Sequence, residues 1–236
     1  MVDKYRVKQK VANCFATPET YLFVDGSEEF DFSKLPPTYV MKATHGWDMS
    51  LLVTDNVVQG ENRNRNDAGR RADAGYLAGV VESWLDPERE IWRLSGERQY
   101  KFVRRGVIFE EFLEPVDYEL QLFLFHGKCR LAMVFYRGFD HSVMTCRLYH
   151  PLWRPLAPAS PPGERLYERV APDPPPPPKS LMKSLKQLCS TFDHVRADFY
   201  VSKGKYYFGE FTFTHNNGKP GLIGKYDQQL GEFWLP

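Results

Sequence analysis

Runs of β-branched and aromatic residues, separated by glycine, proline and polar turn residues, dominate the pattern along this chain. Such runs predict β-strands, and tyrosine and phenylalanine are concentrated in them. We expect three short strands and two hairpins, at residues 39–42, 51–53, 107–112, 119–136 and 195–214. The first hairpin would turn at His126 and Gly127.

Three segments have helical character. Residues 4–13 predict a short charged helix, and apolar residues recur at roughly helical spacing from Asp67 to Leu85, although glycines interrupt this stretch. A third, amphipathic helix carries one apolar stripe near the C-terminal end, formed by Leu181, Leu185, Leu188 and Phe192.

Proline dominates residues 151–178 and ends in five consecutive prolines at Pro174–Pro178. Such a run adopts the extended polyproline conformation and cannot join the interior of a sheet. We interpret it as a stiff connector within the domain, with a ligand for an SH3-type domain as the alternative.

The second hairpin carries the candidate chemistry. Because side chains alternate across a strand, Arg196 and Asp198 share one face of the first strand, and Glu210 and Thr212 share one face of the second. A three-residue loop at 202–204 would bring these two faces together. A two-residue turn would place the two carboxylates on opposite faces and bury one of them unpaired, so we favour the longer loop.

Two carboxylates held close together repel each other unless a cation lies between them. Hard oxygen ligands suit Mg²⁺, which commonly takes one or two carboxylates together with phosphate oxygens. A magnesium site that serves a bound nucleotide is therefore one interpretation of Asp198 and Glu210. A surface salt-bridge cluster of Arg196 with these two carboxylates is the other, and the residues alone favour neither.

The motif Arg196-x-Asp198, a Gly204-Lys205 turn and Gly209-Glu210-Phe-Thr212 resembles the metal-binding hairpin of ATP-grasp enzymes, most of all their TupA-like branch. That branch is associated with teichuronopeptide synthesis. The resemblance extends over nearly the whole chain. Its other parts are Asp3-Lys4-Tyr5-x-Val7, Leu35-Pro36-x-x-Tyr39-Val40-x-Lys42-x-x-His45-Gly46, Gln99-Tyr100, Val107-Ile-Phe-Glu110-Glu111-Phe-Leu113 and Phe125-His-Gly127-Lys128.

The resemblance implies an α+β protein with the ATP-grasp fold. Residues 1–236 would form a single ATP-grasp domain with two lobes of mainly antiparallel sheet and flanking helices. We expect the smaller lobe, which carries the phosphate lid, at about 36–106, and the larger, metal-binding lobe at 107–236.

The resemblance also implies roles for individual residues. Lys4 and Lys42 would reach the phosphates of ATP, and His45 and Gly46 begin the lid over them. Glu110 to Leu113 resembles the hinge between the lobes, where Glu111, or alternatively Glu110, meets the adenine. Further along the chain, Glu119 would accept hydrogen bonds from the ribose, Asp198, Glu210 and Thr212 would hold Mg²⁺, and Arg196 would steady the transferred phosphoryl group.

The implied reaction is the ATP-dependent joining of a carboxylate to an amine through an acyl phosphate. Positioning and charge neutralisation dominate such a transfer, so no protein nucleophile is expected. The acid would be a small molecule or linked to a polymer, in polysaccharide, peptide or natural-product biosynthesis. A phosphotransferase without an amine acceptor and a nucleotide-binding scaffold without catalysis are the alternatives.

Two segments depart from the family pattern. Trp47 and Asp48 replace the small residues of a glycine-rich phosphate lid, and the carboxylate of Asp48 would repel a nucleotide. Val143 stands where an arginine is expected, which leaves Arg137 and His141 as candidates for binding an anionic substrate. We expect this short sequence to be without the separate N-terminal domain of many ATP-grasp enzymes, so a partner protein or a second copy could supply part of the acceptor site.

Composition and net charge limit the partners that we expect for this protein. The chain has 236 residues and a formal charge of +1, so no overall field draws it to nucleic acid or to an anionic membrane. Four arginines between Asn62 and Arg71 lack the interleaved aromatic residues that stack on bases, and we interpret them as a solvated loop.

Four scattered cysteines form no zinc-binding or disulfide pattern, and no signal peptide is visible at the N-terminus. The longest apolar runs are too short to span a bilayer. We therefore expect a cytoplasmic protein with no membrane span and no nucleic-acid partner.

Overall fold

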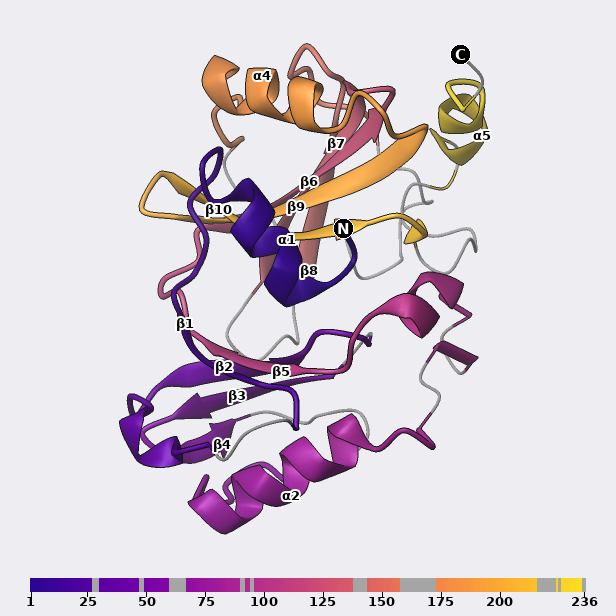
Figure 1. Cartoon of the computed structure of the whole chain (residues 1–236). Coiled ribbons are helices and arrows are strands. Elements are labelled where there is room, and N and C mark those ends of the chain that lie inside the picture. The colour runs from indigo at the N-terminus through magenta and orange to yellow at the C-terminus, as the bar shows by residue number, and fades with distance from the viewer. Residues whose placement is uncertain are drawn as a thin grey trace. The chain divides into compact units, whose positions relative to one another are not determined.

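The computed structural model describes residues 1–26, 30–46, 49–59, 67–89, 92–93, 96–137, 144–157, 173–215, 224 and 226–234. The chain divides into two compact units. Unit 1 comprises residues 1–10 and 17–114, and unit 2 comprises residues 11–16 and 115–236. Each unit carries one five-stranded antiparallel sheet with helices, so the predicted α+β class is confirmed (Figure 1).

Unit 1 is built on a sheet with the strand order β1-β5-β2-β3-β4. Its strands are β1 (Thr20–Val24), β2 (Tyr39–Ala43), β3 (Ser50–Thr54), β4 (Val57–Gln59) and β5 (Val107–Glu110). Its helices are α1 (Lys4–Val11), whose last residue belongs to unit 2, α2 (Ala74–Leu85) and the 3₁₀ helices η1 (Phe32–Lys34) and η2 (Arg98–Phe102).

Helix α2 covers one face of this sheet. Alternate residues of β2 point toward it, with Tyr39, Met41 and Ala43 all buried in one hydrophobic cluster with α2. From α2 the cluster includes Tyr76, Leu77, Val80, Val81 and Trp84. The other face of the sheet presents the intervening residues, and on β2 and β5 these include Lys42 and Glu110.

The predicted start of this helix at Asp67 is wrong. Gly69 adopts a left-handed φ of +83°, and its N–H donates to the carbonyl of Val58 in strand β4. Residues 67–72 therefore form a turn against β4, and the helix begins after Asp73, whose carboxylate caps it by accepting from the N–H of Tyr76 (2.9 Å).

Unit 2 is built on a sheet with the strand order β10-β9-β6-β7-β8. Its strands are β6 (Tyr118–Phe125), β7 (Lys128–Arg137), β8 (Met144–Tyr149), β9 (His194–Ser202) and β10 (Lys205–Thr212). Its helices are α4 (Lys179–Leu188) and α5 (Tyr226–Gly231). Both predicted hairpins are confirmed, as β6–β7 and β9–β10.

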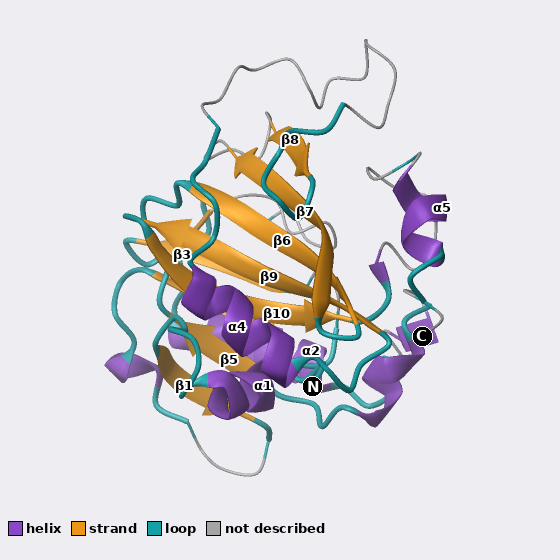
Figure 2. Cartoon of the chain, turned by 90° about the horizontal axis from the view of Figure 1, so that it is seen from above, coloured by secondary structure: helices purple, strands orange, loops and turns teal. Residues whose placement is uncertain are grey.

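Helix α4 runs across the sheet in both views (Figures 1 and 2), and its predicted apolar stripe is buried at Leu181 and Leu185. The turn between β6 and β7 abuts the end of this helix. There Gly127 has a φ of +73°, and a Cβ at this position would lie 2.6 Å from the carbonyl oxygen of Lys186. Only glycine satisfies both the backbone conformation and this close approach.

The run Pro174–Pro178 leads directly into α4 and forms no strand. The indole of Trp153 donates to the carbonyl of Pro174 (2.7 Å), and Asp173 accepts from Arg147 and Tyr149. The proline run is thus held against residues on and after β8, as expected of a connector within the unit.

The division between the units differs from the predicted lobe boundary at residue 107. Strand β5 pairs with β1 and β2 in unit 1, and unit 2 takes up the chain at Pro115. Within the described ranges, no helix combines the length and apolar character needed to cross a bilayer.

Candidate functional site

The turn between β9 and β10 has two residues, so the predicted three-residue loop is wrong. Ser202 pairs with Lys205, and the intervening Lys203 and Gly204 both have a left-handed φ (51° and 73°), the pattern of a type I′ turn. The register then shifts by one residue at a β-bulge between Phe208 and Glu210.

This bulge produces the arrangement that the longer loop was expected to give. Phe208 pairs with Phe199, Gly209 is the extra residue, and Glu210 pairs with Asp198. Thr212 pairs with Arg196 in the next position on the same face. The four polar residues predicted on this hairpin are therefore brought together.

Arg196 is the centre of this group. Its guanidinium makes a two-pronged contact with Asp198, from Nε to Oδ1 (2.7 Å) and from Nη2 to Oδ2 (2.5 Å). Nη2 also donates to the hydroxyl of Thr212 (3.1 Å), and Nη1 donates to Nδ1 of His215 (2.5 Å). The side chain of Arg196 is 11% exposed, and these four contacts fix the direction of its guanidinium.

His215 was missed by the sequence analysis. It lies three residues beyond the end of β10, where no pattern of alternation points to it. Because an arginine N–H can only donate, Nδ1 of His215 is an acceptor and its proton resides on Nε2. Burial and the charges of Arg196 and His194 lower the pKa of His215 to about 4, so the ring is neutral.

Burial, and to a smaller extent two neighbouring carboxylates, oppose the ionisation of Asp198. Burial raises the pKa of its carboxyl, and so do the charges of Glu210 and Glu119, whereas Arg196 lowers it; the result is a pKa of about 6. A second cation beside Asp198 and Glu210 would favour the ionised form of both carboxyl groups. Two carboxylates and the hydroxyl of Thr212 are oxygen donors of the kind that Mg²⁺ takes, so the residues present fit that ion.

The predicted magnesium ligands are these two carboxylates and one hydroxyl. Among the residues that the structure describes, no group of three or more histidine, cysteine, aspartate or glutamate side chains is gathered at a potential metal site. Phosphate oxygens would have to complete the coordination of an ion here, as is common for Mg²⁺.

In unit 1 the candidate residues surround a buried carboxylate. Glu110, on β5, is 1% exposed, and its two oxygens are paired with two different lysines. Oε1 lies 2.5 Å from Nζ of Lys42 on β2, and Oε2 contacts Nζ of Lys8 on α1. An adenine contact is the less favoured role for Glu110, because both of its oxygens already accept from lysines.

Lys8 is the second residue that the sequence analysis missed. Burial, the largest influence, lowers the pKa of Lys8, and so do Lys42 and Lys4, whereas Glu110 raises it. For Glu110, burial opposes ionisation, but the charges of Lys42 and Lys8 hold its pKa below the ordinary value. Lys8 and Lys42 thus meet at one carboxylate, and lysine ammonium groups are suited to an anionic ligand such as the phosphates of ATP.

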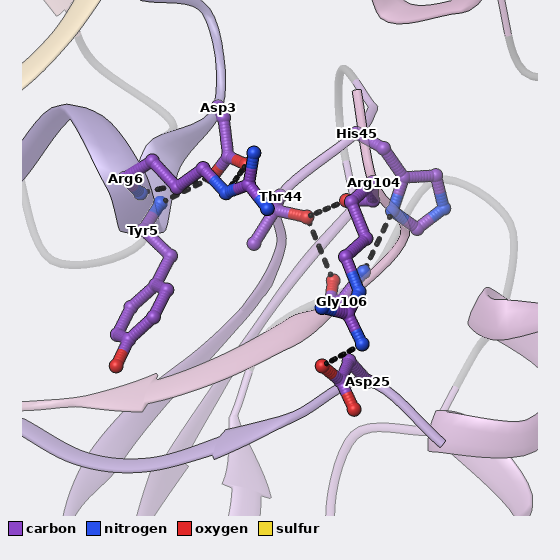
Figure 3. Close-up of polar contacts among 8 residues, drawn as sticks. All are labelled: Asp3, Tyr5, Arg6, Asp25, Thr44, His45, Arg104 and Gly106. Atoms are coloured by element: carbon purple, nitrogen blue, oxygen red, sulfur yellow. Dashed lines mark hydrogen bonds and ion pairs between the residues drawn. The ribbon is translucent and has the colours of Figure 1, made fainter. Parts of the chain in front are cut away.

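Lys4 and Gly46, both predicted to serve ATP binding, are in contact: Nζ of Lys4 donates to the carbonyl of Gly46 (2.9 Å). Asp3 caps the start of α1 by accepting from the N–H groups of Tyr5 and Arg6 (2.9 and 3.0 Å; Figure 3). The N-terminal segment that resembles the family thus stabilises the first turn of the helix that carries Lys4 and Lys8.

Both ring nitrogens of His45 contact backbone groups of unit 1. Figure 3 shows its ring directed at Gly106, whose N–H donates to Nδ1 (3.4 Å), while Nε2 donates to the carbonyl of Trp84 (3.0 Å). Burial and the charge of Arg105 lower the pKa of His45 to about 4. A neutral ring with both nitrogens engaged holds the end of β2 in place.

Thr44 and Arg104 make further contacts near the end of β2 (Figure 3). The hydroxyl of Thr44 donates to the carbonyl of Arg104 (3.0 Å) and lies 3.2 Å from that of Gly106, while the guanidinium of Arg104 pairs with Asp25 (2.7 Å). A Cβ on Gly106 would lie 2.5 Å from the ring of Phe23, so the close approach of these strands requires glycine.

The remaining predicted residues are placed as follows. Glu111 is tied to Glu19 through two contacts, its N–H to the carbonyl (2.8 Å) and its carboxylate to the N–H (3.2 Å). Leu113 is buried near the end of unit 1. Glu119, on β6 of unit 2, lies on the polar face, where its charge raises the pKa of Asp198.

Two predictions concern segments that the structure does not describe. His141 and the departures Trp47 and Asp48 lie outside the described residues. Arg137 is the last residue of β7 and pairs with Met144 of β8, but only its backbone is described. Their roles remain predictions.

A profile of the family described as TupA-like ATPgrasp matches residues 1–235. The chain belongs to this family. The resemblance noted in the sequence is thereby confirmed, and with it the predicted ATP-grasp fold. No curated protein sequence gives a significant match to the chain.

Solved structures agree with the fold of this TupA-like ATPgrasp chain. It resembles the D-alanine–D-alanine ligase of Bacillus anthracis in two crystal structures. The structure complexed with ATP gives 13% identity, a TM-score of 0.50 and coverage of 99% of this chain and 62% of the ligase. The other gives 14% identity, a TM-score of 0.52 and coverage of 99% and 63%. At such identity the likeness concerns the fold alone, and this chain matches less than two thirds of the ligase's length.

Proposed function

We propose that this protein is an ATP-dependent carboxylate–amine ligase that forms an amide through an acyl phosphate. The observation that carries the proposal is the polar face of β9 and β10, where the bulge sets Glu210 opposite Asp198 and Arg196 lies beside them. Family membership supports the same class of reaction.

In the proposed reaction an oxygen of the substrate carboxylate attacks the γ-phosphorus of ATP and ADP leaves. The amine then attacks the acyl carbon, the carbon–oxygen bond to phosphate breaks, and an amide and inorganic phosphate are released. Asp198, Glu210 and Thr212 would hold Mg²⁺, which when bound neutralises the charge of the polyphosphate. Arg196, held in one direction by its partners, would contact the transferred phosphoryl group.

Four of the predicted residues would bind the nucleotide. Lys42 and Lys4 would contact its phosphates as compact cations on flexible side chains. Glu111 is our candidate for the adenine and Glu119 for the ribose. The acid and the amine are proposed only as classes, a small or polymer-linked carboxylate and an amine donor, in polysaccharide, peptide or natural-product biosynthesis.

Calorimetric titration with ATP, with and without Mg²⁺, tests this proposal. We expect wild type to bind ATP in a magnesium-dependent manner, Lys42→Ala to lose affinity, and Asp198→Asn to lose the dependence on magnesium. Asp193→Asn is the matched control, because the side chain of Asp193 is 74% exposed and lies outside the polar face. Thermal unfolding of each variant would show that the loss of binding is not a loss of folding.

The outcomes of this titration and of product analysis distinguish the candidate functions. Wild type that binds no nucleotide would contradict the ligase and favour a scaffold without catalysis. If ATP binds, product analysis with acids and amines separates the alternatives: a ligase makes an amide or ADP only when the amine is present, whereas a phosphotransferase makes ADP and a phosphorylated acid without it. Unfolding of Asp198→Asn would instead indicate a structural salt bridge.

A further inference from the structure

Glu110 has one lysine more than its charge requires. Its carboxylate is 1% exposed, and each oxygen has its own ammonium partner, Lys42 on one side and Lys8 on the other. One lysine would suffice to neutralise one carboxylate. The second therefore calls for an explanation, because burying an additional ammonium group is costly.

The two lysines differ in exposure and in how they are held. The side chain of Lys42 is 20% exposed, whereas that of Lys8 is 7% exposed. Lys8 lies on helix α1, which is fixed to the sheet by the stacking of Tyr5 on Phe23, with ring centroids 4.0 Å apart. Lys42 lies near the end of β2, and its long side chain has access to solvent.

A buried carboxylate cannot give up its last cation cheaply. Removing one partner of a buried ion pair leaves an uncompensated charge, and this costs more than the pair itself contributed. If Lys42 were the single partner of Glu110, moving its ammonium group to a phosphate would strand the carboxylate. With Lys8 in place, Glu110 stays paired when Lys42 leaves.

We propose that Lys8 is a positioning residue that keeps Glu110 paired, so that Lys42 can leave the carboxylate and bind a phosphate of ATP. This inference rests on the proposed function, in which Lys42 contacts the nucleotide. It assigns Lys8 no contact with ATP and Glu110 no contact with adenine.

A charge-removal series tests the proposal. Lys8→Met would leave Lys42 as the single described partner of Glu110, so we expect Mg–ATP to bind about tenfold or more weakly in calorimetry. In the double variant Lys8→Met/Glu110→Gln the neutral amide no longer retains Lys42, and we expect affinity to return close to the wild-type value. Lys10→Met, the same substitution at an exposed position of α1, is the matched control.

The rescue distinguishes positioning from the other roles of Lys8. If Lys8 contacted ATP directly or only stabilised α1, the double variant would bind as weakly as Lys8→Met. If Lys8→Met bound ATP as wild type does, the proposal would also be overturned, while the proposed function would stand. Wild type that binds no ATP would overturn both. Should Lys8→Met fail to fold, comparison of the double variant with Glu110→Gln decides, because equal affinities are expected and a loss confined to the double variant contradicts the proposal.

Discussion

Glu210 is the cross-strand partner of Asp198, and a single inserted residue makes it so. After a two-residue turn, a regular ladder would pair Asp198 with Gly209 and turn Glu210 toward the apolar face. The bulge shifts the register by one and brings the second carboxylate onto the polar face. The chemistry proposed for this hairpin therefore depends on a local irregularity of β10.

Gly209→Ala should weaken this arrangement. A Cβ at this position would lie 3.1 Å from the ring of Tyr200 and 3.3 Å from the carbonyl oxygen of Asp198, closer than ordinary contact. We expect a loss of about 1–2 kcal/mol in the free energy of unfolding and a weaker magnesium dependence of ATP binding. Urea denaturation and calorimetry measure the two effects.

Gly204→Ala is the control for that experiment. It strains the left-handed turn residue by about 1–2 kcal/mol but meets nothing within 4 Å and lies away from Glu210. Its magnesium dependence should equal that of wild type. If both variants lost the dependence equally, general destabilisation rather than the position of Glu210 would account for it.

Gly127→Ala should cost more stability than Gly204→Ala, although both glycines have a φ of +73°. At Gly127 the added Cβ would also lie 2.6 Å from a backbone oxygen of α4 and 3.0 Å from the Cα of Ser190, so the helix would have to move. We expect a loss of about 3 kcal/mol or more, as for an overpacked core position with backbone strain. Equal losses for the two variants, measured by urea denaturation, would show that α4 moves away from the added Cβ at little cost in stability.

The strands and hairpins of this fold could be predicted from the sequence because local rules decide them. Tyr39 to Lys42 forms a strand because its alternate residues pack against α2, and the turn at His126 and Gly127 combines a polar residue with a glycine. The group around Arg196 could also be predicted, since its members share a face of one hairpin.

What the sequence could not show arises from long-range contacts and from irregular backbone. In the sequence, Lys8 has the pattern of an ordinary solvated lysine on a charged helix. Nothing local indicates that its partner is Glu110, about a hundred positions away. His215 lies past the end of its strand, where periodicity gives no direction. The bulge at Gly209 was missed because a three-residue loop with a regular ladder would place Asp198 and Glu210 on one face just as a two-residue turn followed by a bulge does.

Histidine protonation should destabilise the protein as the pH falls from about 6.5 to about 4. The pKa of His45 is about 4 in the folded protein and near its ordinary value of 6.5 when unfolded, so in this window the unfolded chain binds more protons. Stability attributable to His45 is present above pH 6.5 and is lost as the pH falls. Its contribution is up to about 3 kcal/mol.

His45→Gln should therefore make the free energy of unfolding less dependent on pH, as urea denaturation between pH 4.5 and 7.5 would show. Thr44→Val is the control, because it removes a neighbouring hydrogen bond (3.0 Å) without removing a titrating group. It should lower stability by about 1 kcal/mol at every pH. An identical pH dependence in His45→Gln and wild type would contradict the prediction.

Arg196→Gln should raise the pKa of two histidines. Burial is the largest cause of the low pKa of His215 and of His194, and the charge of Arg196 lowers both further. Without that charge each pKa should rise from about 4 toward, but not up to, 6.5, because the rings stay buried. Arg196→Lys keeps the positive charge and should change the values less. His45, whose pKa shift does not involve Arg196, is the internal reference in the NMR titration.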